Sequence, residues 1–303
     1  MKLSDTKEGR KDMVKIGDLC PLFFNPIKDN FGIECDYIQT FYTEDKILIQ
    51  LFSDGEPPIM LYNLTKDFAV EDLDIKQYVH NDDVTMYYFV ITGLADGVYM
   101  LSVDGEESEP FCVTSDDGIL ETTSLIRYSH KDNNSVFDNI FWVGDERQVF
   151  EWRVEAGFKS SGYSPKVDSE QYRNQFQEIT QLYSMPYDSY TLTVGNAGGV
   201  PYWFVRHLNR LFCVSDVTIN GEGWVRSEGS VPEMTQVLEG MPSYHATMLL
   251  EPRKNAVSGI GGVSEEGTSS SVVGFSIVNP TDGQMLQYKE DKSAFVNVTT
   301  IES

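Results

Sequence analysis

The sequence predicts a mainly β fold: a β-sandwich, a second β-rich domain with one short helix, and a C-terminal β extension. Two observations lead to this prediction. Short segments of alternating or continuous apolar residues recur along the chain, as they do in strands that have a buried face. Between them stand Asp54-Gly55, Asp96-Gly97 and Asp104-Gly105, residue pairs that tolerate the positive φ angles of hairpin turns.

The first domain, residues 20–120, contains four clear strand patterns. They cover residues 46–52, 86–92, 98–103 and 110–114. The stretch 94–101 resembles the tyrosine corner of immunoglobulin-like domains, in which a tyrosine hydroxyl ties a loop to the strand that follows. We therefore expect an immunoglobulin-like sandwich in which the Tyr99 hydroxyl bonds to nearby backbone. The inter-sheet cysteine pair and the tryptophan of antibody domains are missing, so the resemblance is limited to the architecture.

The second domain, residues 121–252, is expected to be built on strands as well. Its strand patterns cover residues 125–129, 136–142, 149–155 and 244–250. The first two flank a turn-forming run and should form a hairpin. The third alternates with period two, so that Phe150, Trp152 and Val154 share a core face. A further hairpin is predicted at residues 213–226, around a turn at residues 220–223 that begins Asn-Gly.

One helix is predicted in this domain, at residues 201–211. Proline stands at its first turn, where it is tolerated, and Phe204, Leu208 and Leu211 form an apolar stripe. Residues 168–183 also place apolar residues at helical spacing. They are rich in glutamine and adjoin a strand pattern, so the sequence leaves their structure open.

The remaining segments are an N-terminal arm at residues 1–19, a linker at 253–271 and a C-terminal β extension at 272–303. The linker is rich in glycine and serine and too poor in large apolar residues to form a core. Strand patterns return at residues 272–278 and 294–299. A strand pair this small cannot be stable alone, so we expect it to dock on another chain or on its own second domain.

The chain is strongly acidic, with 47 Asp and Glu against 23 Lys and Arg, a net charge of −24. Such a charge repels a phosphate backbone, so nucleic acid is not an expected partner. The N-terminus is charged and lacks the apolar stretch of a signal peptide, and no run approaches the roughly 18 apolar residues of a membrane span. We therefore expect neither export by that route nor a membrane span.

No sequence motif indicates catalysis, a cofactor or a metal. P-loop, GxGxxG, GxSxG and HExxH patterns are absent, and the four histidines and four cysteines show no ligand spacing. Glu151 and Glu155 would lie about 13 Å apart on one strand face, farther than the two carboxyl groups of a glycosidase. We expect no enzyme activity, no cofactor and no metal.

A basic side of the predicted helix is the candidate contact. Arg206, His207 and Arg210 are expected opposite the apolar stripe, where they could bind an acidic neighbour or an anion. In a chain of charge −24, such a patch offers a docking surface for a second copy. A solvated helix face explains the same pattern equally well.

Three stretches carry a resemblance to a known family. They are FEWRVEAG at residues 150–157, residues 187–195, and GVPYWFVRHLNR at 199–210 running into 217–221. They resemble a domain of virion structural proteins from tailed phages of Bacteroides-type hosts, including crAss-like phages. Residues 279–288 and 294–297 resemble a short β unit of phage fibre proteins. The resemblance implies a tail or neck component made in the host cytoplasm, a homo-oligomeric ring or an adaptor that contacts other tail, neck or fibre proteins.

The leading hypothesis is therefore a non-enzymatic virion protein in which residues 121–252 make the subunit contacts. A carbohydrate-binding module is the first alternative, because sixteen tyrosines and four tryptophans could stack on sugar rings, and aromatic exposure distinguishes the two. An acid/base hydrolase of the host envelope is the second. It requires carboxyl groups that converge in a cleft.

Overall fold

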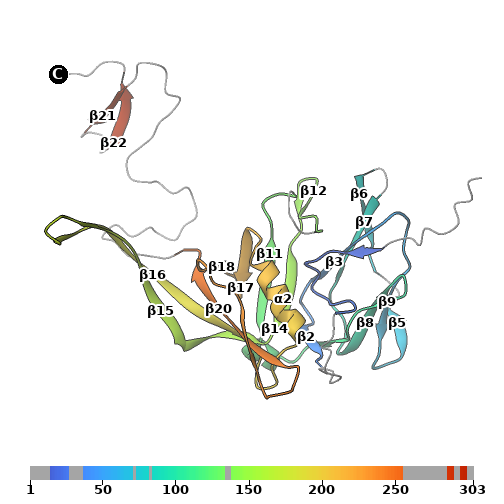
Figure 1. Ribbon diagram of the computed structural model, residues 1–303. Coiled ribbons are helices and arrows are strands. Elements are labelled where there is room, and N and C mark those ends of the chain that lie inside the picture. The colour runs from blue at the N-terminus through green and yellow to red at the C-terminus, as the bar shows by residue number, and fades with distance from the viewer. Residues whose placement is uncertain are drawn as a thin grey trace, which may run out of the picture. The chain divides into compact units, whose positions relative to one another are not determined.

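Figure 1 shows the computed structural model, which describes residues 14–26, 37–70, 73–81, 84–133, 138–254, 285–289 and 294–298. It is mainly β, as predicted, and the chain forms two compact units, Met1–Val257 and Ser258–Ser303. The described residues include two helices, α1 (Gly118–Thr122) and α2 (Tyr202–Leu211). The two domains that the sequence divides at residue 120 both lie in the first unit.

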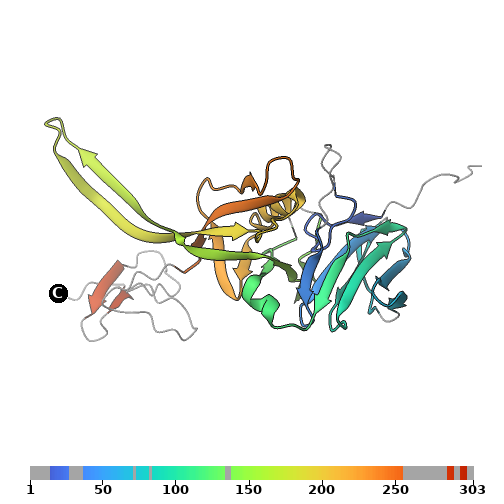
Figure 2. The same cartoon turned by 90° about the horizontal axis from the view of Figure 1, so that it is seen from below.

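The immunoglobulin-like sandwich consists of two sheets, seen from below in Figure 2. The order in one sheet is β1 (Lys15–Ile16), β3 (Ile47–Ser53), β7 (Val84–Ile91), β6 (Lys76–Asn81). The order in the other is β2 (Gln39–Tyr42), β10 (Phe111–Thr114), β8 (Gly97–Val103), β4 (Ile59–Asn63), β5 (Phe68–Val70), with β9 (Glu106–Glu107) beside β8. Strands β2 and β10 run parallel, and the other paired strands of the two sheets are antiparallel.

Alternate residues of β3, β7, β8 and β10 fill the space between the two sheets. On β3, Ile47, Ile49 and Leu51 belong to this core. Leu48 and Gln50, which lie between them, are also buried. They are covered because the outer face of this sheet packs on the second β-rich part. One face of strand β3 therefore packs in the sandwich core, and its other face packs on the second β-rich part.

Tyr99 forms the predicted tyrosine corner. Its ring is buried, and its hydroxyl donates to the Ala95 carbonyl oxygen at 2.8 Å. Burial raises the pKa of the phenol, so the hydroxyl keeps its proton and remains a donor. The bond ties the loop before Gly97 to strand β8. The predicted immunoglobulin-like architecture is confirmed.

The second β-rich part is one sheet that carries helix α2. Its order is β14 (Phe150–Val154), β11 (Ser124–Ser129), β17 (Asp216–Ile219), β18 (Glu222–Arg226), β20 (Tyr244–Pro252), β16 (Ile179–Val194), β15 (Ala156–Arg173), with β19 (Glu233–Gln236) beside β20. The chain passes from β14 to β15 through the single residue Glu155. The first and last strands in this order, β14 and β15, are therefore joined directly by Glu155.

The apolar core of this part lies between the sheet and α2. Phe150, Trp152 and Val154 are all buried, which confirms the core face predicted for this strand. The Trp152 ring lies 5.4 Å from the ring of Phe204 on α2. The same core includes Leu208 of the helix and explains why α2 lies on this face.

The hairpin predicted around Asn220-Gly221 is present. It joins β17 to β18, and the two turn residues have φ angles of 51° and 89°, as a type I′ turn requires. The Asn220 side chain accepts a hydrogen bond from the backbone N–H of Leu125 at 2.9 Å. The turn is thereby anchored to β11.

The hairpin predicted between residues 125–129 and 136–142 is wrong. Strand β11 instead pairs with β14 on one side and with β17 on the other. Asn133 closes a loop rather than a hairpin, because its Oδ1 accepts hydrogen bonds from the backbone N–H groups of Phe141 and Trp142. The ladder that follows joins β12 (Trp142–Val143) to β13 (Glu146–Arg147).

Residues 168–183 form the far parts of β15 and β16 and the turn between them. In the turn, the Asn174 side chain accepts hydrogen bonds from the backbone N–H groups of Phe176 and Glu178, both at 2.9 Å. The apolar residues at helical spacing therefore lie on two strands and, in the case of Phe176, in the turn between them.

Part of the predicted N-terminal arm, residues 1–19, belongs to the fold, and residues 1–13 lie outside the described residues. Lys15–Ile16 form β1, and Leu19 is fully buried with its N–H donating to the Asn139 side chain at 3.0 Å. Residues from 255 onward in the predicted linker, and the strand pattern at 272–278, lie outside the described residues. In the second unit, β21 (Met285–Lys289) and β22 (Ala294–Val298) pair antiparallel.

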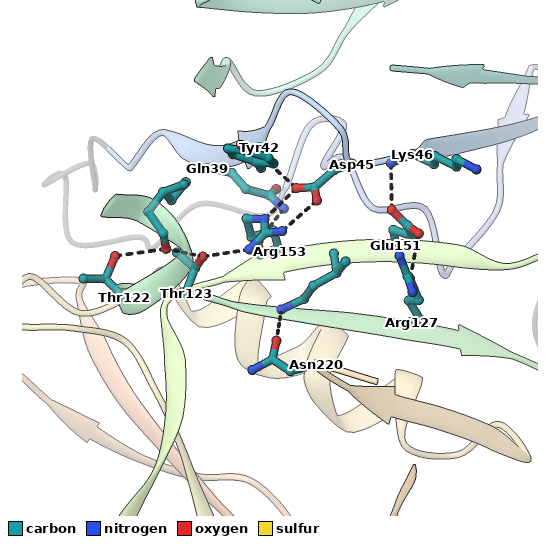
Figure 3. A network of polar contacts seen from close by, with 12 residues as sticks. Gln39, Tyr42, Asp45, Lys46, Thr122, Thr123, Arg127, Glu151, Arg153 and Asn220 are labelled. Carbon is teal, nitrogen blue, oxygen red and sulfur yellow. Dashed lines mark hydrogen bonds and ion pairs between the residues drawn. The ribbon is translucent and has the colours of Figure 1, made fainter. Parts of the chain in front are cut away.

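A buried ion pair joins the sandwich to the second sheet (Figure 3). The Arg153 guanidinium of β14 binds the Asp45 carboxylate through Nε at 2.6 Å and Nη2 at 2.7 Å. The two side chains are only 6% and 3% exposed. Arg153 also donates from Nη1 to Thr123 Oγ1, and its carbonyl oxygen accepts from Gln39 Nε2. The buried charges are thus surrounded by hydrogen-bonding partners.

Glu151, on the same face of β14, makes a second connection (Figure 3). One carboxylate oxygen accepts from the Lys46 backbone N–H at 2.7 Å, and the other binds Arg127 Nε at 2.8 Å. Gln50 adds a two-way contact, since its amide donates to the Ile140 carbonyl oxygen at 2.7 Å and accepts from the Ile140 N–H at 3.0 Å. These directional bonds fix the orientation of the sandwich on the sheet.

Replacing Tyr99 by phenylalanine removes only the corner hydroxyl. We expect Tyr99→Phe to lower the free energy of unfolding by about 1 kcal/mol, the net value of a typical buried hydrogen bond. Urea unfolding measures the difference. Tyr172→Phe removes a hydroxyl from a ring that is 58% exposed and should leave stability unchanged. An equal loss in the two variants would show that the corner bond contributes nothing.

Arg153→Met should lower the free energy of unfolding by about 3–5 kcal/mol, because it leaves the Asp45 carboxylate buried without its counter-charge. Adding Asp45→Leu should restore most of that loss, since neither charge of this pair then remains. Lys15→Met is the control: it breaks an ion pair with Asp138 whose side chains are 57% and 50% exposed, for at most about 1 kcal/mol. A double variant no more stable than Arg153→Met contradicts this account.

Candidate assembly surfaces

Helix α2 places the three predicted interface residues in different surroundings. Pro201 precedes the first helical residue in an extended conformation, with φ −63° and ψ 154°. Arg206 is exposed, whereas Arg210 is half-buried and pairs with Asp18, Nη1 to Oδ1, at 3.0 Å. His207 is only 4% exposed. The helix surface therefore offers Arg206 and part of Arg210, and not His207.

The prediction that His207 lies on the outer side of α2 is wrong, and helical periodicity explains why. Phe204, Leu208 and Leu211 are buried, as predicted. His207 follows Phe204 by three residues and precedes Leu211 by four, so it belongs to the same helix face. The spacing alone places His207 in the core, despite its polar side chain.

Aromatic rings surround His207. The ring centroids of Trp152 and Phe23 lie 4.8 and 5.5 Å away. The Tyr128 hydroxyl donates its proton to the Leu19 carbonyl oxygen at 2.7 Å, so the phenol oxygen is left to accept from His207 Nε2 at 3.3 Å. Burial, with a smaller contribution from the Arg210 charge, lowers the pKa of His207 to about 3. The imidazole is therefore neutral at pH 7 and acts as a core residue.

A hollow of about 250 Å³ lies between α2 and the N-terminal segment. Asp18, Trp203, Arg206 and Arg210 contribute to its lining. Because Asp18 pairs with Arg210, Arg206 is the cation best placed to attract an acidic group of another molecule. The thiol that lines the hollow, Cys20, has its pKa raised to about 12 by burial and is not a nucleophile at neutral pH.

None of the four tryptophans is exposed. Trp152 and Trp224 are buried, and Trp142 and Trp203 are half-buried. The Trp142 indole donates to the His130 carbonyl oxygen at 3.0 Å. Stacking on a sugar ring needs an open aromatic face. The tryptophans therefore do not favour the carbohydrate-binding alternative.

Glu151 and Glu155 bind groups of the sandwich. Glu151 accepts from the Lys46 backbone, and Glu155 accepts from the Tyr37 hydroxyl. Both carboxylates therefore have hydrogen-bond partners in the sandwich. In the part of the chain that the structure describes, no group of three or more His, Cys, Asp or Glu side chains could hold a metal. None of the described helices is long and apolar enough to cross a membrane.

A two-stranded ribbon projects from the body in both Figure 1 and Figure 2. Residues 190–194 of β16 pair with β20, whereas before residue 190 β16 pairs with β15 alone. We call residues 164–189 the arm; the term refers to this ribbon alone and not to the N-terminal residues 1–19. From Ser164 to the turn at Asn174 the arm spans roughly 33 Å at about 3.3 Å per residue.

The root of the arm contains a bulge in β15. The pairing register shifts between Phe158 and Tyr163, so extra residues of β15 face a shorter stretch of β16. Gly162 lies in this bulge, where an added Cβ would come within 2.9 Å of the Thr191 Cβ atom. A bulge bends a strand and increases its twist. The local backbone at residues 159–162 therefore sets the direction of the arm.

The arm exposes large apolar side chains although it has no core. Their exposed fractions run from 41% at Met185 to 75% at Phe176. The full set is Val167, Tyr172, Phe176, Ile179, Leu182, Tyr183 and Met185. A lone two-stranded hairpin is at best marginally stable in water. A partner that covers these side chains would bury the apolar surface that the arm lacks.

The arm was not predicted from the sequence, although a signal for it exists. Tyr183, Met185 and Tyr187 alternate with polar residues or proline, which is a strand pattern of period two. Pro186 within this run is typical of an edge strand. Asn174 supplies the turn residue.

No protein-family model and no curated protein matches the chain. Among solved structures, it is similar to the filamin domain of Lin-41, with 8% identity over 34% of this chain and all of that domain, at a TM-score of 0.19. It is also similar to a complex of Dpr2 Ig1-Ig2 with DIP-Theta Ig1-Ig3, with 10% identity over 81% of this chain and 91% of that one, at a TM-score of 0.18. Neither likeness assigns a function.

His207 should make the protein sensitive to acid. Its pKa is about 3 in the fold against 6.5 for a free histidine, so the unfolded chain binds the proton more readily. Stability from the neutral imidazole is therefore complete above pH 6.5 and falls as the pH drops towards 3, by up to about 1.4 kcal/mol per pH unit. Urea unfolding between pH 7 and pH 4 measures this slope. His207→Gln should flatten it, and an unchanged slope would exclude His207 as the cause.

Proposed function

We propose that this chain is a non-enzymatic structural protein that builds a ring or adaptor in the tail or neck of a tailed-phage virion. The observation that carries the proposal is the arm, whose exposed apolar side chains would be buried by contact with another chain. The virion setting rests on the resemblance of residues 150–252 to phage structural proteins. The chain would then act in the virion after synthesis in the host cytoplasm.

The body of the protein supports this role through its rigidity. A contact element transmits force and position only if its root is fixed, and the arm grows from a sheet that buried charges and directional hydrogen bonds join to the sandwich. A subunit of this kind presents its contact surfaces at constant angles. Closed rings require that constancy, because each subunit must meet the next in the same way.

Purified full-length protein provides the direct test. Native mass spectrometry and electron microscopy should find a closed assembly with a fixed number of copies. A dispersed monomer that binds glycans on an array would instead favour the carbohydrate-binding alternative. Release of sugars or peptides from purified host envelope would favour the hydrolase.

Arg206 is the exposed cation of the proposed interface on α2. We expect Arg206→Glu to weaken self-association about tenfold, because an attraction to an acidic neighbour becomes a repulsion, and to leave the unfolding transition unchanged. Added salt should narrow the difference between variant and wild type. Lys76→Glu makes the same charge change on an exposed residue of β6 and should have little effect. If Arg206→Glu combined with Arg210→Glu assembles normally, α2 is not an interface.

A further inference from the structure

One face of the arm carries tyrosine and carboxylate side chains together. Residues paired across β15 and β16 share a face, and every second residue along a strand returns to it. We call the side that includes Glu170 the tyrosine face; its pairs are Lys166 with Tyr187, Asp168 with Met185, Glu170 with Tyr183, and Tyr172 with Thr180. Tyr172 and Tyr183 are 58% and 44% exposed, and both carboxylates are exposed as well. This face therefore presents aromatic rings beside negative charge.

Prolines protect the edges of the arm from strand addition. Pro165 pairs with Asp188, and Pro186 pairs with Val167, within regular parts of the ladder. A proline has no N–H to donate, so in a paired strand its nitrogen must face away from the partner, toward the free edge. One proline on each strand thus interrupts each edge. A partner is expected to cover a face of the arm and not to extend its sheet.

Helix α2 offers a surface of the opposite charge, beside the hollow of about 250 Å³. Trp203, Arg206 and Arg210 contribute to the lining of the hollow, and Asp18 is bound to Arg210. Two arginines thus face one carboxylate, so this surface is positive in a chain of net charge −24. A cavity of about 150 Å³ is large enough to bind benzene. The hollow therefore has room for one aromatic ring next to an exposed cation.

The two surfaces match in spacing as well as in charge. Glu170 and Tyr183 are directly paired, so their Cβ atoms lie about 5 Å apart. Trp203 and Arg206 are three residues apart on α2, which places their Cβ atoms about 5–6 Å apart. A carboxylate can therefore reach the Arg206 guanidinium while the neighbouring phenol ring reaches the hollow beside Trp203. Tyrosine, tryptophan and arginine are also the residue types most enriched among those that dominate binding energy.

The arm of a subunit points away from the hollow of the same subunit. The hollow lies between α2 and the N-terminal segment, and its lining includes Ile16 of the sandwich strand β1. Figures 1 and 2 both show the arm projecting from the body on the side away from the sandwich. An arm that reaches this hollow must therefore come from another copy.

We propose that the tyrosine face of the arm binds helix α2 of a second copy of this chain, with Glu170 paired to Arg206 and the Tyr183 ring in the hollow. The contact brings opposite charges together and buries apolar side chains that the arm exposes. It is heterologous, because the donor and acceptor surfaces differ, and such head-to-tail contacts generate rings when the rotation between copies closes. The inference rests on the proposed structural function and identifies its subunit contact.

A charge swap in the full-length chain tests the pairing. Glu170→Arg sets an arginine of the arm against Arg206, and Arg206→Glu sets two glutamates against each other. Each change alone should weaken self-association about tenfold in analytical ultracentrifugation. The double variant, Glu170→Arg with Arg206→Glu, restores opposite charges at every contact and should regain most of the wild-type association.

Mixing the two single variants gives a sharper result. In an assembly where they alternate, the arm of the Glu170→Arg variant meets the helix of the Arg206→Glu variant, and the other contact keeps its native charges. An equimolar mixture should therefore associate more tightly than either variant alone. Native mass spectrometry should find the two variants in equal numbers in the assemblies.

The aromatic anchor has its own test. Tyr183→Ala should weaken self-association about 30-fold, the effect of a typical residue that dominates an interface. Val167→Ala is the matched control, because Val167 is 56% exposed and lies on the opposite face of the same arm. Gln171→Arg adds a positive charge to that opposite face. Both controls should assemble like wild type.

Four outcomes contradict the inference, and they separate its failure from that of the proposed function. If Glu170→Arg and Tyr183→Ala assemble as well as wild type, the arm is not the donor, although the structural function stands. If neither the double variant nor the mixture regains association, Glu170 does not pair with Arg206. Loss of assembly in Val167→Ala rejects the choice of face. A wild-type chain that stays monomeric at high concentration rejects the contact and the proposed ring together.

Discussion

The architecture depends on a strand that is buried on both faces. Strand β14 presents Phe150, Trp152 and Val154 to the core of its own sheet, while Glu151 and Arg153 face the sandwich. A charged group in such a place is tolerated only when a counter-charge and hydrogen bonds replace the water that it has lost. Asp45 meets that requirement for Arg153, and the match is directional. The two β-rich parts therefore cannot slide or rotate on each other without exposing or orphaning a charge, and they behave as one body.

The polypeptide chain connects this junction to the proposed contact surfaces. Strand β14 continues through Glu155 into β15, so the strand that holds the sandwich also forms one side of the arm. Trp152, on its other face, packs on Phe204 of α2 and so fixes the helix that exposes Arg206. The Tyr37 hydroxyl of the sandwich side binds Glu155 at the corner between the two strands. The junction between the sandwich and the sheet, helix α2 and the arm are thus all connected through β14.

Local patterns in the sequence were sufficient where neighbouring residues decide the structure. The tyrosine corner, the Asn220-Gly221 turn and the apolar face of β14 all follow from short-range rules. The polar face of β14 could not be predicted, because alternation assigns Glu151 and Arg153 to water unless a second domain is known to cover them. His207 was missed because its polarity outweighed its position in the helical stripe. The sequence did not assign a structure to residues 168–183, because apolar residues on two strands joined by a turn can also fall at helical spacing.

The bulge at the root of the arm has a consequence for geometry. An arm roughly 33 Å long turns a rotation of about 5° at its base into a displacement of about 3 Å at its tip, close to the reach of a van der Waals contact. Angular tolerance at residues 159–162 is therefore narrow, and Gly162 occupies the place where a larger residue would push the two strands apart. In a head-to-tail assembly the number of copies follows from the angle between neighbours. If the proposed ring forms through the arm, the few residues around Gly162 set its diameter, and insertions or deletions there give rings of other sizes from an unchanged body.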